Sequence, residues 1–285
     1  METIQPTGKV ILAGAGPGDP ELITAKAIRY LRQADVVLTD RLVSDTILRD
    51  YVHPQAEVIY VGKQCRRGNS TPQATINELM VQYARQGRLV VRLKGGDVSI
   101  FSNILDELQA LTASGIPYEI IPGVTAALGA AATAGMPLTA RGYATAVRFL
   151  TFYKSDVITE TYWKELAATE DTLVFYMSSE TLDQVVQQLV RCGADPARKL
   201  AVVEQATTPN QRVYVHDLYE YARRESGRAY LSPSLVVIGR VVDLHSQFAW
   251  MGVTGERTEY FKPGAFLAAG QPAAGEQAAK RVNRA

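Results

Sequence analysis

The stretch KVILAGAGPGDPEL, residues 9–22, indicates how the fold begins. Its first five residues are mostly apolar and include two β-branched side chains, which is typical of a buried strand, and a glycine cluster then ends the run. Pro20 and Glu21 open a segment with apolar residues near one helical face, and residues 36–40 form the next apolar run. The pattern predicts a strand, a glycine-rich loop, a helix and a second strand.

The alternation of strands and helices continues along the chain, although less regularly in the second half. Such alternation predicts a mostly parallel sheet covered by helices on both faces. We expect an α/β protein with domains at residues 1–141 and 142–250, followed by a mobile tail at residues 251–285. Further expected strands are residues 58–61, 89–93, 118–121, 146–151, 172–177, 200–204 and 234–242, and expected helices are residues 73–86, 104–114 and 182–192.

Composition excludes several classes of function. The formal net charge of +1 over 285 residues gives no general attraction to nucleic acid or to an anionic membrane, so neither is expected as a partner. No apolar run is long enough to span a bilayer, and the start METIQPTGK lacks the apolar core of a signal peptide, which makes the cytoplasm the expected location. The two cysteines, Cys65 and Cys192, and the three histidines are scattered, so no metal site is predicted.

The first glycine loop, GAGPGDP at residues 14–20, invites comparison with a dinucleotide-binding loop. Asp40 even lies about 20 residues further on, where that fingerprint places an acid on the ribose. The glycines, however, occur at every second position, Pro17 has no N–H to donate, and Asp19 puts negative charge where a pyrophosphate would bind. These differences make an NAD-dependent oxidoreductase the less favoured hypothesis.

Two further glycine loops follow predicted strands. They are RLKGGD at residues 92–97 and IPGVTAA at residues 121–127. Each could be a simple strand-to-helix turn, but the carboxyl ends of strands in an open α/β sheet converge on the crevice where ligands bind. Three such loops in one sheet favour a binding site.

The order of these motifs resembles the tetrapyrrole methylase family, and within it the uroporphyrinogen-III C-methyltransferases. The resemblance spans residues 9–243 and is carried by these segments in order: KVILAGAGPGDPEL, ADVVLTDRLVS, VGK, VVRLKGGD, PGVTAALGAAATAGMPLTAR, VFYM and VVEQATTPNQ. It implies two α/β domains with a cleft between them for S-adenosylmethionine, usually in a homodimer. The implied reaction is methylation of uroporphyrinogen III at C2 and C7 to precorrin-2, for sirohaem or cobalamin synthesis, and the alternative is methylation of a later precorrin.

The resemblance also implies which residues form the site. Its proton-handling positions correspond to Asp40 and Lys63, although a structural ion pair of Asp40 with Arg41 or Lys63 is the alternative. Met177 could instead be an ordinary core residue. The positions that would contact S-adenosylmethionine are Pro17, Gly95, Gly96, Asp97, Ile100, Thr125, Ala126, Met177 and Ala206.

The substrate of the family carries many carboxylates, so cations are needed near the site. Candidates in or beside the motif loops are Arg41, Arg66, Arg67, Arg141 and Arg148. The segment at residues 98–107 departs from the family, since relatives have a proline after Gly-Gly-Asp and then an Arg-Gly-Gly-Glu-Glu type stretch. This departure puts local substrate contacts in question. Because the methylase motifs begin at residue 9, we expect no dehydrogenase and chelatase module ahead of them.

Overall fold

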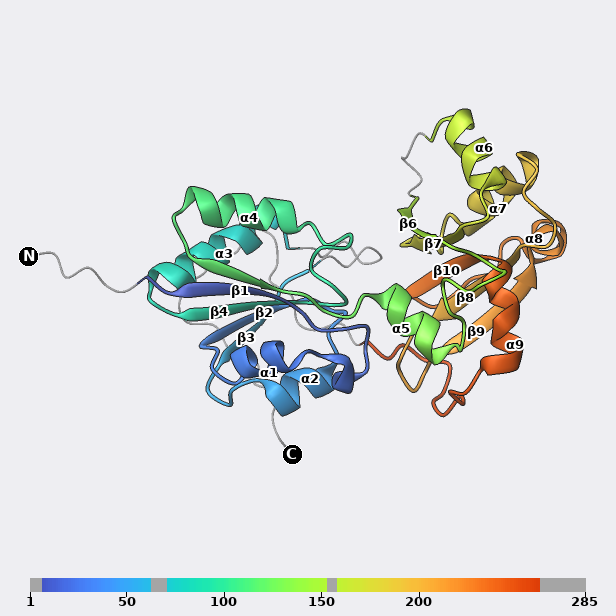
Figure 1. Ribbon diagram of the computed structural model, residues 1–285. Coiled ribbons are helices and arrows are strands. Elements are labelled where there is room, and N and C mark those ends of the chain that lie inside the picture. Colours follow the sequence, from blue (N-terminus) through green and yellow to red (C-terminus); the bar gives the residue numbers. More distant parts are fainter. Residues whose placement is uncertain (1–6, 63–70, 153–157, 262–285) are drawn as a thin grey trace, which may run out of the picture. The chain divides into compact units, whose positions relative to one another are not determined.

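The computed structural model describes residues 7–62, 71–152 and 158–261 (Figure 1). Its contacts divide the chain into two compact units. The described residues up to Thr125, together with Phe261, belong to the first, and Ala126–Tyr260 form the second. The α/β class predicted for the chain is confirmed, because each unit has one sheet covered by helices.

The first unit, coloured blue to green in Figure 1, is built on a parallel sheet with the strand order β3-β2-β4-β1-β5. Each strand pairs in parallel with its neighbours, as the alternating pattern predicted. The strands are β1 (Lys9–Gly14), β2 (Val36–Thr39), β3 (Glu57–Tyr60), β4 (Leu89–Lys94) and β5 (Tyr118–Ile121).

Helices cover both faces of this sheet. On one face α1 (Ala25–Leu31) and α2 (Asp45–Tyr51) bury apolar side chains against alternate residues of β1, β2 and β4. On the other face α3 (Gln73–Arg85) and α4 (Ile104–Ala113) pack on the remaining alternate residues. Because both faces are buried, the strands consist of nearly continuous apolar runs.

The second unit is not a repetition of the first, which corrects the expectation drawn from the chain's second half. Its sheet has the order β6-β7-β10-β8-β9, and only β6 and β7 run parallel. The other neighbouring pairs are antiparallel. The strands are β6 (Val147–Thr151), β7 (Thr172–Tyr176), β8 (Lys199–Glu204), β9 (Arg212–Asp217) and β10 (Ser234–Gly239), with helices α5 (Ala126–Thr133), α6 (Glu160–Ala168), α7 (Leu182–Arg191), α8 (Leu218–Glu220) and α9 (His245–Phe248).

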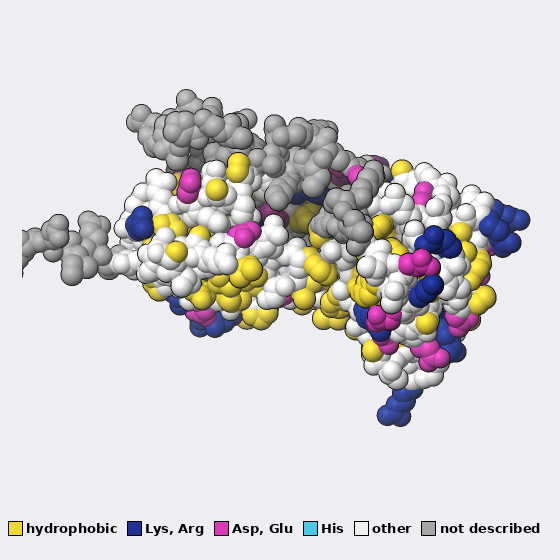
Figure 2. All heavy atoms as spheres, turned by 90° about the horizontal axis from the view of Figure 1, so that it is seen from above, with side chains coloured by type: hydrophobic (Ala, Val, Ile, Leu, Met, Phe, Trp, Pro, Cys, Tyr) yellow, Lys and Arg dark blue, Asp and Glu magenta, His cyan; other side chains and the backbone are white. Residues whose placement is uncertain are grey.

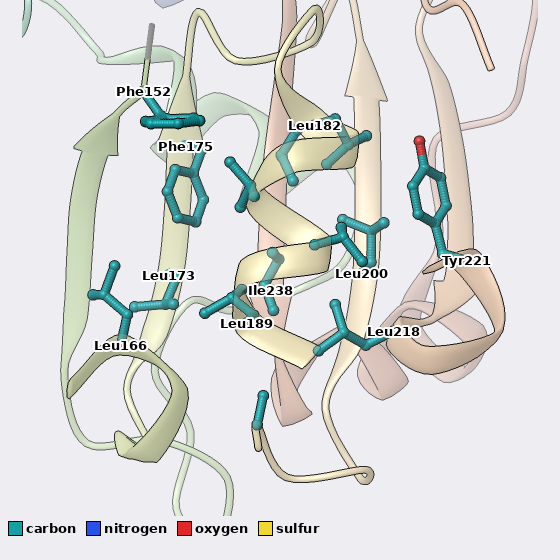
Figure 3. Packing of buried hydrophobic residues seen from close by; sticks show 14 of the residues in the cluster. Phe152, Leu166, Leu173, Phe175, Leu182, Leu189, Leu200, Leu218, Tyr221 and Ile238 are labelled. Atoms are coloured by element: carbon teal, nitrogen blue, oxygen red, sulfur yellow. The ribbon is translucent and has the colours of Figure 1, made fainter. Parts of the chain in front are cut away.

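One face of the second sheet packs against α6 and α7. Figure 3 shows Leu182 and Leu189 of α7 directed towards apolar side chains of the strands, among them Phe175 and Leu200. The opposite face packs against α5, whose small alanine side chains allow the helix to lie close to the strands. This packing explains why the second compact unit begins at Ala126, ahead of the predicted domain boundary at residues 141/142.

The predicted tail begins at residue 251, and the structure describes it as far as residue 261. Between residues 255 and 260 its backbone is hydrogen-bonded to the segment that follows β8, so this part is not loosely packed. Residues 262–285 lie outside the described residues.

The surface of the described residues agrees with the near-zero net charge. On the face seen in Figure 2, basic and acidic side chains are interspersed and form no large patch of one sign. Among the helices of the described residues, none combines the length and the apolar character that a membrane crossing requires.

Candidate functional site

The carboxyl edge of the parallel sheet brings together most of the site residues predicted for the first unit. Pro17 lies in the loop after β1, Asp40 follows β2, and Thr125 ends the loop after β5. The loop between β4 and α4 carries the predicted contacts Gly95, Gly96, Asp97 and Ile100. In a parallel sheet these strand ends share one edge, which is where ligands bind in open α/β folds.

Three of these loops are joined backbone to backbone through glycines. Gly16 and Gly96 exchange two hydrogen bonds, with N···O distances of 3.1 and 2.7 Å. A Cβ placed on Gly123 would lie 2.2 Å from the carbonyl oxygen of Gly96, and one on Gly14 would lie 2.6 Å from the same oxygen. The loops after β1, β4 and β5 can therefore meet only because these residues have no side chain.

Asp97 connects two of the same loops. Its Oδ2 accepts a hydrogen bond from the backbone N–H of Gly123 at 2.9 Å, and its Oδ1 accepts one from Ser99 at 2.7 Å. Each carboxylate oxygen has a further lone pair, so this linkage leaves capacity for a ligand hydroxyl or amine. Contact of Asp97 with a cofactor remains a prediction.

Asp40 performs a similar task between the loops after β2 and β4. Its Oδ1 accepts from the N–H of Leu42 at 2.9 Å, and its Oδ2 accepts from that of Gly95 at 3.3 Å. Gly95 is in turn pressed against Leu42, since an added Cβ would lie 2.6 Å from the Cβ of Leu42. Asp40 is thus held at the carboxyl edge, whereas its predicted partner Lys63 lies outside the described residues.

A buried ionic cluster below the β4–α4 loop was not predicted from the sequence. Glu107 on α4 is fully buried and accepts hydrogen bonds from Arg92 Nε at 3.1 Å and Lys94 Nζ at 2.8 Å. Lys94 Nζ also donates to the carbonyl of Ser102, which closes the loop. Burial, together with the positive charge of Arg92, lowers the pKa of Lys94. Two cations inside an otherwise apolar strand, VVRLK, were the signal that could have revealed the cluster.

The segment expected to differ from the family pattern, residues 98–107, contains two residues with left-handed backbone. Phe101 has φ of 50° and Asn103 has φ of 54°. Asparagine tolerates this conformation better than most residues, which accounts for Asn103 at the start of α4.

Three predicted contact positions belong to the second unit and are described within it. Ala126 is the first residue of α5, Met177 follows β7, and Ala206 follows β8. Met177 is 47% exposed, so its side chain is not an ordinary core residue. It has φ of 55°, and the neighbours of Ala206 have φ of 48° and 68°. Such strain persists only where the surroundings impose it, and it gathers at functional sites.

Among the described arginines considered for substrate carboxylates, Arg148 is held by two acidic side chains. Arg148 Nη1 lies 2.5 Å from Glu165, and its Nε lies 2.7 Å from Asp171. Arg141 is exposed, while Arg66 and Arg67 lie outside the described residues. In the part of the chain that the structure describes, no group of three His, Cys, Asp or Glu side chains could hold a metal ion.

Comparison with known proteins gives one family. The model of the Tetrapyrrole (Corrin/Porphyrin) Methylases matches residues 9–222. A siroheme synthase of Acinetobacter baylyi is 47% identical over 250 residues, which cover 88% of this chain and 54% of that protein. The chain therefore spans about half the length of the curated relatives it matches.

Solved structures agree with this result. The uroporphyrin-III-C-methyltransferase from Thermus thermophilus superposes with a TM-score of 0.71 at 34% identity, covering 85% of this chain and 97% of that one. Its complex with S-adenosyl homocysteine gives 0.69 at 36% identity, covering 82% and 93%. A cobalt precorrin-4 methyltransferase gives 0.70 at 29% identity, covering 82% and 96%.

Proposed function

The chain belongs to the tetrapyrrole methylase family, and from this premise we propose that it transfers methyl groups from S-adenosylmethionine to C2 and C7 of uroporphyrinogen III, giving precorrin-2. The observation that carries the proposal is the meeting of three glycine loops at the carboxyl edge of the parallel sheet. In the family resemblance these same loops supply the contacts to the methyl donor. Precorrin-2 would then serve sirohaem or cobalamin synthesis.

The residues present fit S-adenosylmethionine. Backbone amides and the Asp97 carboxylate at the sheet edge of the first unit suit the ribose and the amino-acid end. The family resemblance assigns Met177, which is 47% exposed, and Ala206 to the adenine. When bound there, S-adenosylmethionine would supply a methyl group attached to a positively charged sulfur, which is a good leaving group. Pro17, Ile100, Thr125 and Ala126 complete the proposed contacts.

The task of the protein is then mainly one of positioning. The substrate carbon must come to about 3–3.5 Å from the methyl carbon and in line with the bond that breaks. With S-adenosylmethionine bound, the methyl carbon would join the substrate carbon as its bond to sulfur breaks, S-adenosylhomocysteine would be the leaving group, and a proton would leave the tetrapyrrole. Asp40, held beside Gly95, is the proposed group that handles this proton together with Lys63.

One further feature completes the proposal. We infer a homodimer, because the family resemblance implies one. A light-scattering measurement that gave a monomer at micromolar concentration would contradict the dimer.

A later precorrin is the second candidate substrate. It is favoured by the similar TM-scores of 0.71 and 0.70 to the two kinds of methyltransferase, and by the departure at residues 98–107. The test gives the purified protein S-adenosylmethionine with uroporphyrinogen III or, separately, with precorrin-4. Fast methylation of uroporphyrinogen III supports the proposal, and methylation of precorrin-4 alone contradicts it.

Binding of the cofactor is tested by calorimetry with S-adenosylhomocysteine. Gly96→Val is the matched variant, because Gly96 has φ of 71° and a branched side chain is strained in that conformation. We expect the wild type to bind and the folded variant to lose binding. Binding of NADH with no response to S-adenosylhomocysteine would favour the oxidoreductase instead.

A further inference from the structure

Residues 255–260 form a short strap across the loop that follows β8, residues 205–211. Gly255 starts the strap, and its N–H donates to the carbonyl of Pro209 at 2.8 Å. Its own carbonyl accepts from Arg212 Nη2 at 2.6 Å. The start of the strap is thus fixed to the end of this loop and to the first residue of β9.

The middle of the strap holds the first residue of the loop. Gln205 is fully buried, and its Nε2 donates to the carbonyl of Thr258 at 2.9 Å. Its Oε1 accepts from the N–H of Tyr260 at 2.6 Å, so both ends of the amide are bound by the strap. Asn210 Nδ2 also donates to the carbonyl of Thr258, at 3.0 Å.

An ion pair reinforces these contacts. Arg257 Nη2 lies 3.0 Å from Oε1 of Glu204, the last residue of β8. The side chain of Glu204 is 0% exposed, and Oε1 also accepts from the N–H of Leu231 at 2.7 Å. A buried carboxylate needs such partners, so detaching the strap would leave Glu204 without its arginine.

The loop at residues 205–211 requires support because two of its residues have a left-handed backbone conformation. Gln205 has φ of 48° and Thr207 has φ of 68°, and residues other than glycine are strained in this left-handed backbone conformation. Ala206 lies between them. On the far side, the N–H of Thr207 donates to Oε1 of Gln211 at 2.7 Å, and Thr133 of α5 donates to the same oxygen. Neighbours on both sides therefore hold Ala206 in place.

We propose that the strap is a positioning element for the methyl donor, fixing Ala206 in the conformation that receives the adenine end of S-adenosylmethionine. This inference rests on the proposed function, since that function assigns Ala206 to the cofactor. Residues 255–260 follow the part of the chain matched by the family model, which ends at residue 222. The strap lies within the tail predicted to be mobile, residues 251–285.

Gly255→Ala is the decisive variant. The added Cβ would lie 2.1 Å from Asn210 Oδ1, so the Asn210 side chain must turn away and lose its hydrogen bond to Thr258. It would also lie 2.9 Å from the carbonyl oxygen of Pro209, so the backbone of the strap must shift by a few tenths of an ångström from the loop. Gly252→Ala is the matched control, because a Cβ at Gly252 meets nothing within 4 Å. Neither glycine has the left-handed backbone that would strain alanine.

The readouts are the Kd for S-adenosylhomocysteine and the KM values for S-adenosylmethionine and uroporphyrinogen III, measured on the 285-residue chain. In Gly255→Ala we expect the Kd and the KM for S-adenosylmethionine to rise about tenfold, which corresponds to about 1.4 kcal/mol, with the KM for uroporphyrinogen III unchanged. Gly252→Ala should match the wild type. A purely structural strap would lower the melting temperature and leave the ratio of the two KM values unchanged.

Asn210→Ala provides a second variant in case Gly255→Ala does not fold. It removes the hydrogen bond to Thr258 without a clash, and we expect the same shift in Kd to be about threefold. Wild-type Kd values in both folded variants would overturn the inference. A wild type that binds no S-adenosylhomocysteine would instead contradict the proposed function, so the two failures are distinguishable.

Discussion

Gly123→Ala would place a methyl group where the backbone of two other loops already lies. The new Cβ would be 2.2 Å from the carbonyl oxygen of Gly96 and 2.9 Å from the Cα of Gly14, closer than the 3.0 Å below which real Cβ atoms essentially never approach. The loops after β1, β4 and β5 must therefore separate by about 1 Å. The hydrogen bond from the N–H of Gly123 to Asp97 would be lost or lengthened with them.

The size of the effect follows from this displacement. Overpacking of this kind costs about 1–3 kcal/mol of unfolding free energy. A shift of about 1 Å in groups that position a ligand costs up to about 100-fold, so we expect the Kd for S-adenosylhomocysteine to rise by about 10- to 100-fold. The loops after β1 and β4, which the added methyl group would displace, both carry proposed cofactor contacts.

The assay is calorimetry with S-adenosylhomocysteine, combined with urea denaturation of the same samples. Gly252→Ala is again the control, because its added Cβ has no neighbour within 4 Å. If folded Gly123→Ala bound the ligand with a Kd within twofold of the wild type, the junction of the three glycine loops would not be part of the cofactor site.

Other predictions concern charged residues of the first unit. Asp40→Asn should lower kcat at least tenfold while the Kd for S-adenosylhomocysteine stays within about threefold, because the amide keeps the shape but not the charge; a wild-type kcat would reduce Asp40 to a support for the N–H groups of Leu42 and Gly95. Glu107→Gln should lower the unfolding free energy by about 3–5 kcal/mol in urea denaturation, since it removes the carboxylate that pairs with two buried cations; a loss below about 1 kcal/mol would contradict this account of the cluster. Lysine and tyrosine partners, with Lys26 the strongest, lower the pKa of Glu119 from 4.5 to about 2, so its contribution is present above pH 4.5 and is lost as the pH falls towards about 2. Glu119→Gln should flatten the pH dependence of the unfolding free energy in that window, and an unchanged slope would show that the carboxylate gains nothing from folding.

The parallel sheet could be predicted because its signals are local. Short apolar runs such as residues 9–13 mark buried strands, and glycine clusters mark where the strands end. The loops of the candidate site followed from the same signals, because parallel strands end at a common edge.

The second sheet could not be predicted in the same way. Hydrophobic patterning shows that a segment is a strand but does not give its direction, so the antiparallel pairing of β8 and β10 was missed. β9 was also missed, since this edge strand is only half-buried and its sequence RVYVHD mixes apolar and charged side chains. The position of α5 against the second sheet could not be predicted either, because it depends on contacts between residues that lie far apart in the sequence.

Contacts made by backbone atoms are the hardest to predict from a sequence. The carbonyl of Thr258 holds the strap to the loop after β8 and that of Gly255 holds it to Arg212 of β9, and any residue type can supply a carbonyl. Composition rich in glycine and alanine therefore suggested a mobile tail from residue 251 onwards. The charged residues of the Glu107 cluster can be identified in the sequence, but which of them pair depends on the three-dimensional fold.

The proposed activity of this chain is the transfer of two methyl groups from S-adenosylmethionine to uroporphyrinogen III. The most direct test uses S-adenosylmethionine with a carbon-13 methyl group and follows the purified tetrapyrrole product by mass spectrometry and NMR. The account predicts two labelled methyl groups, at C2 and C7, with none in a reaction containing folded Gly96→Val. Label at another carbon, or no label on uroporphyrinogen III with a wild type that binds S-adenosylhomocysteine, would contradict it.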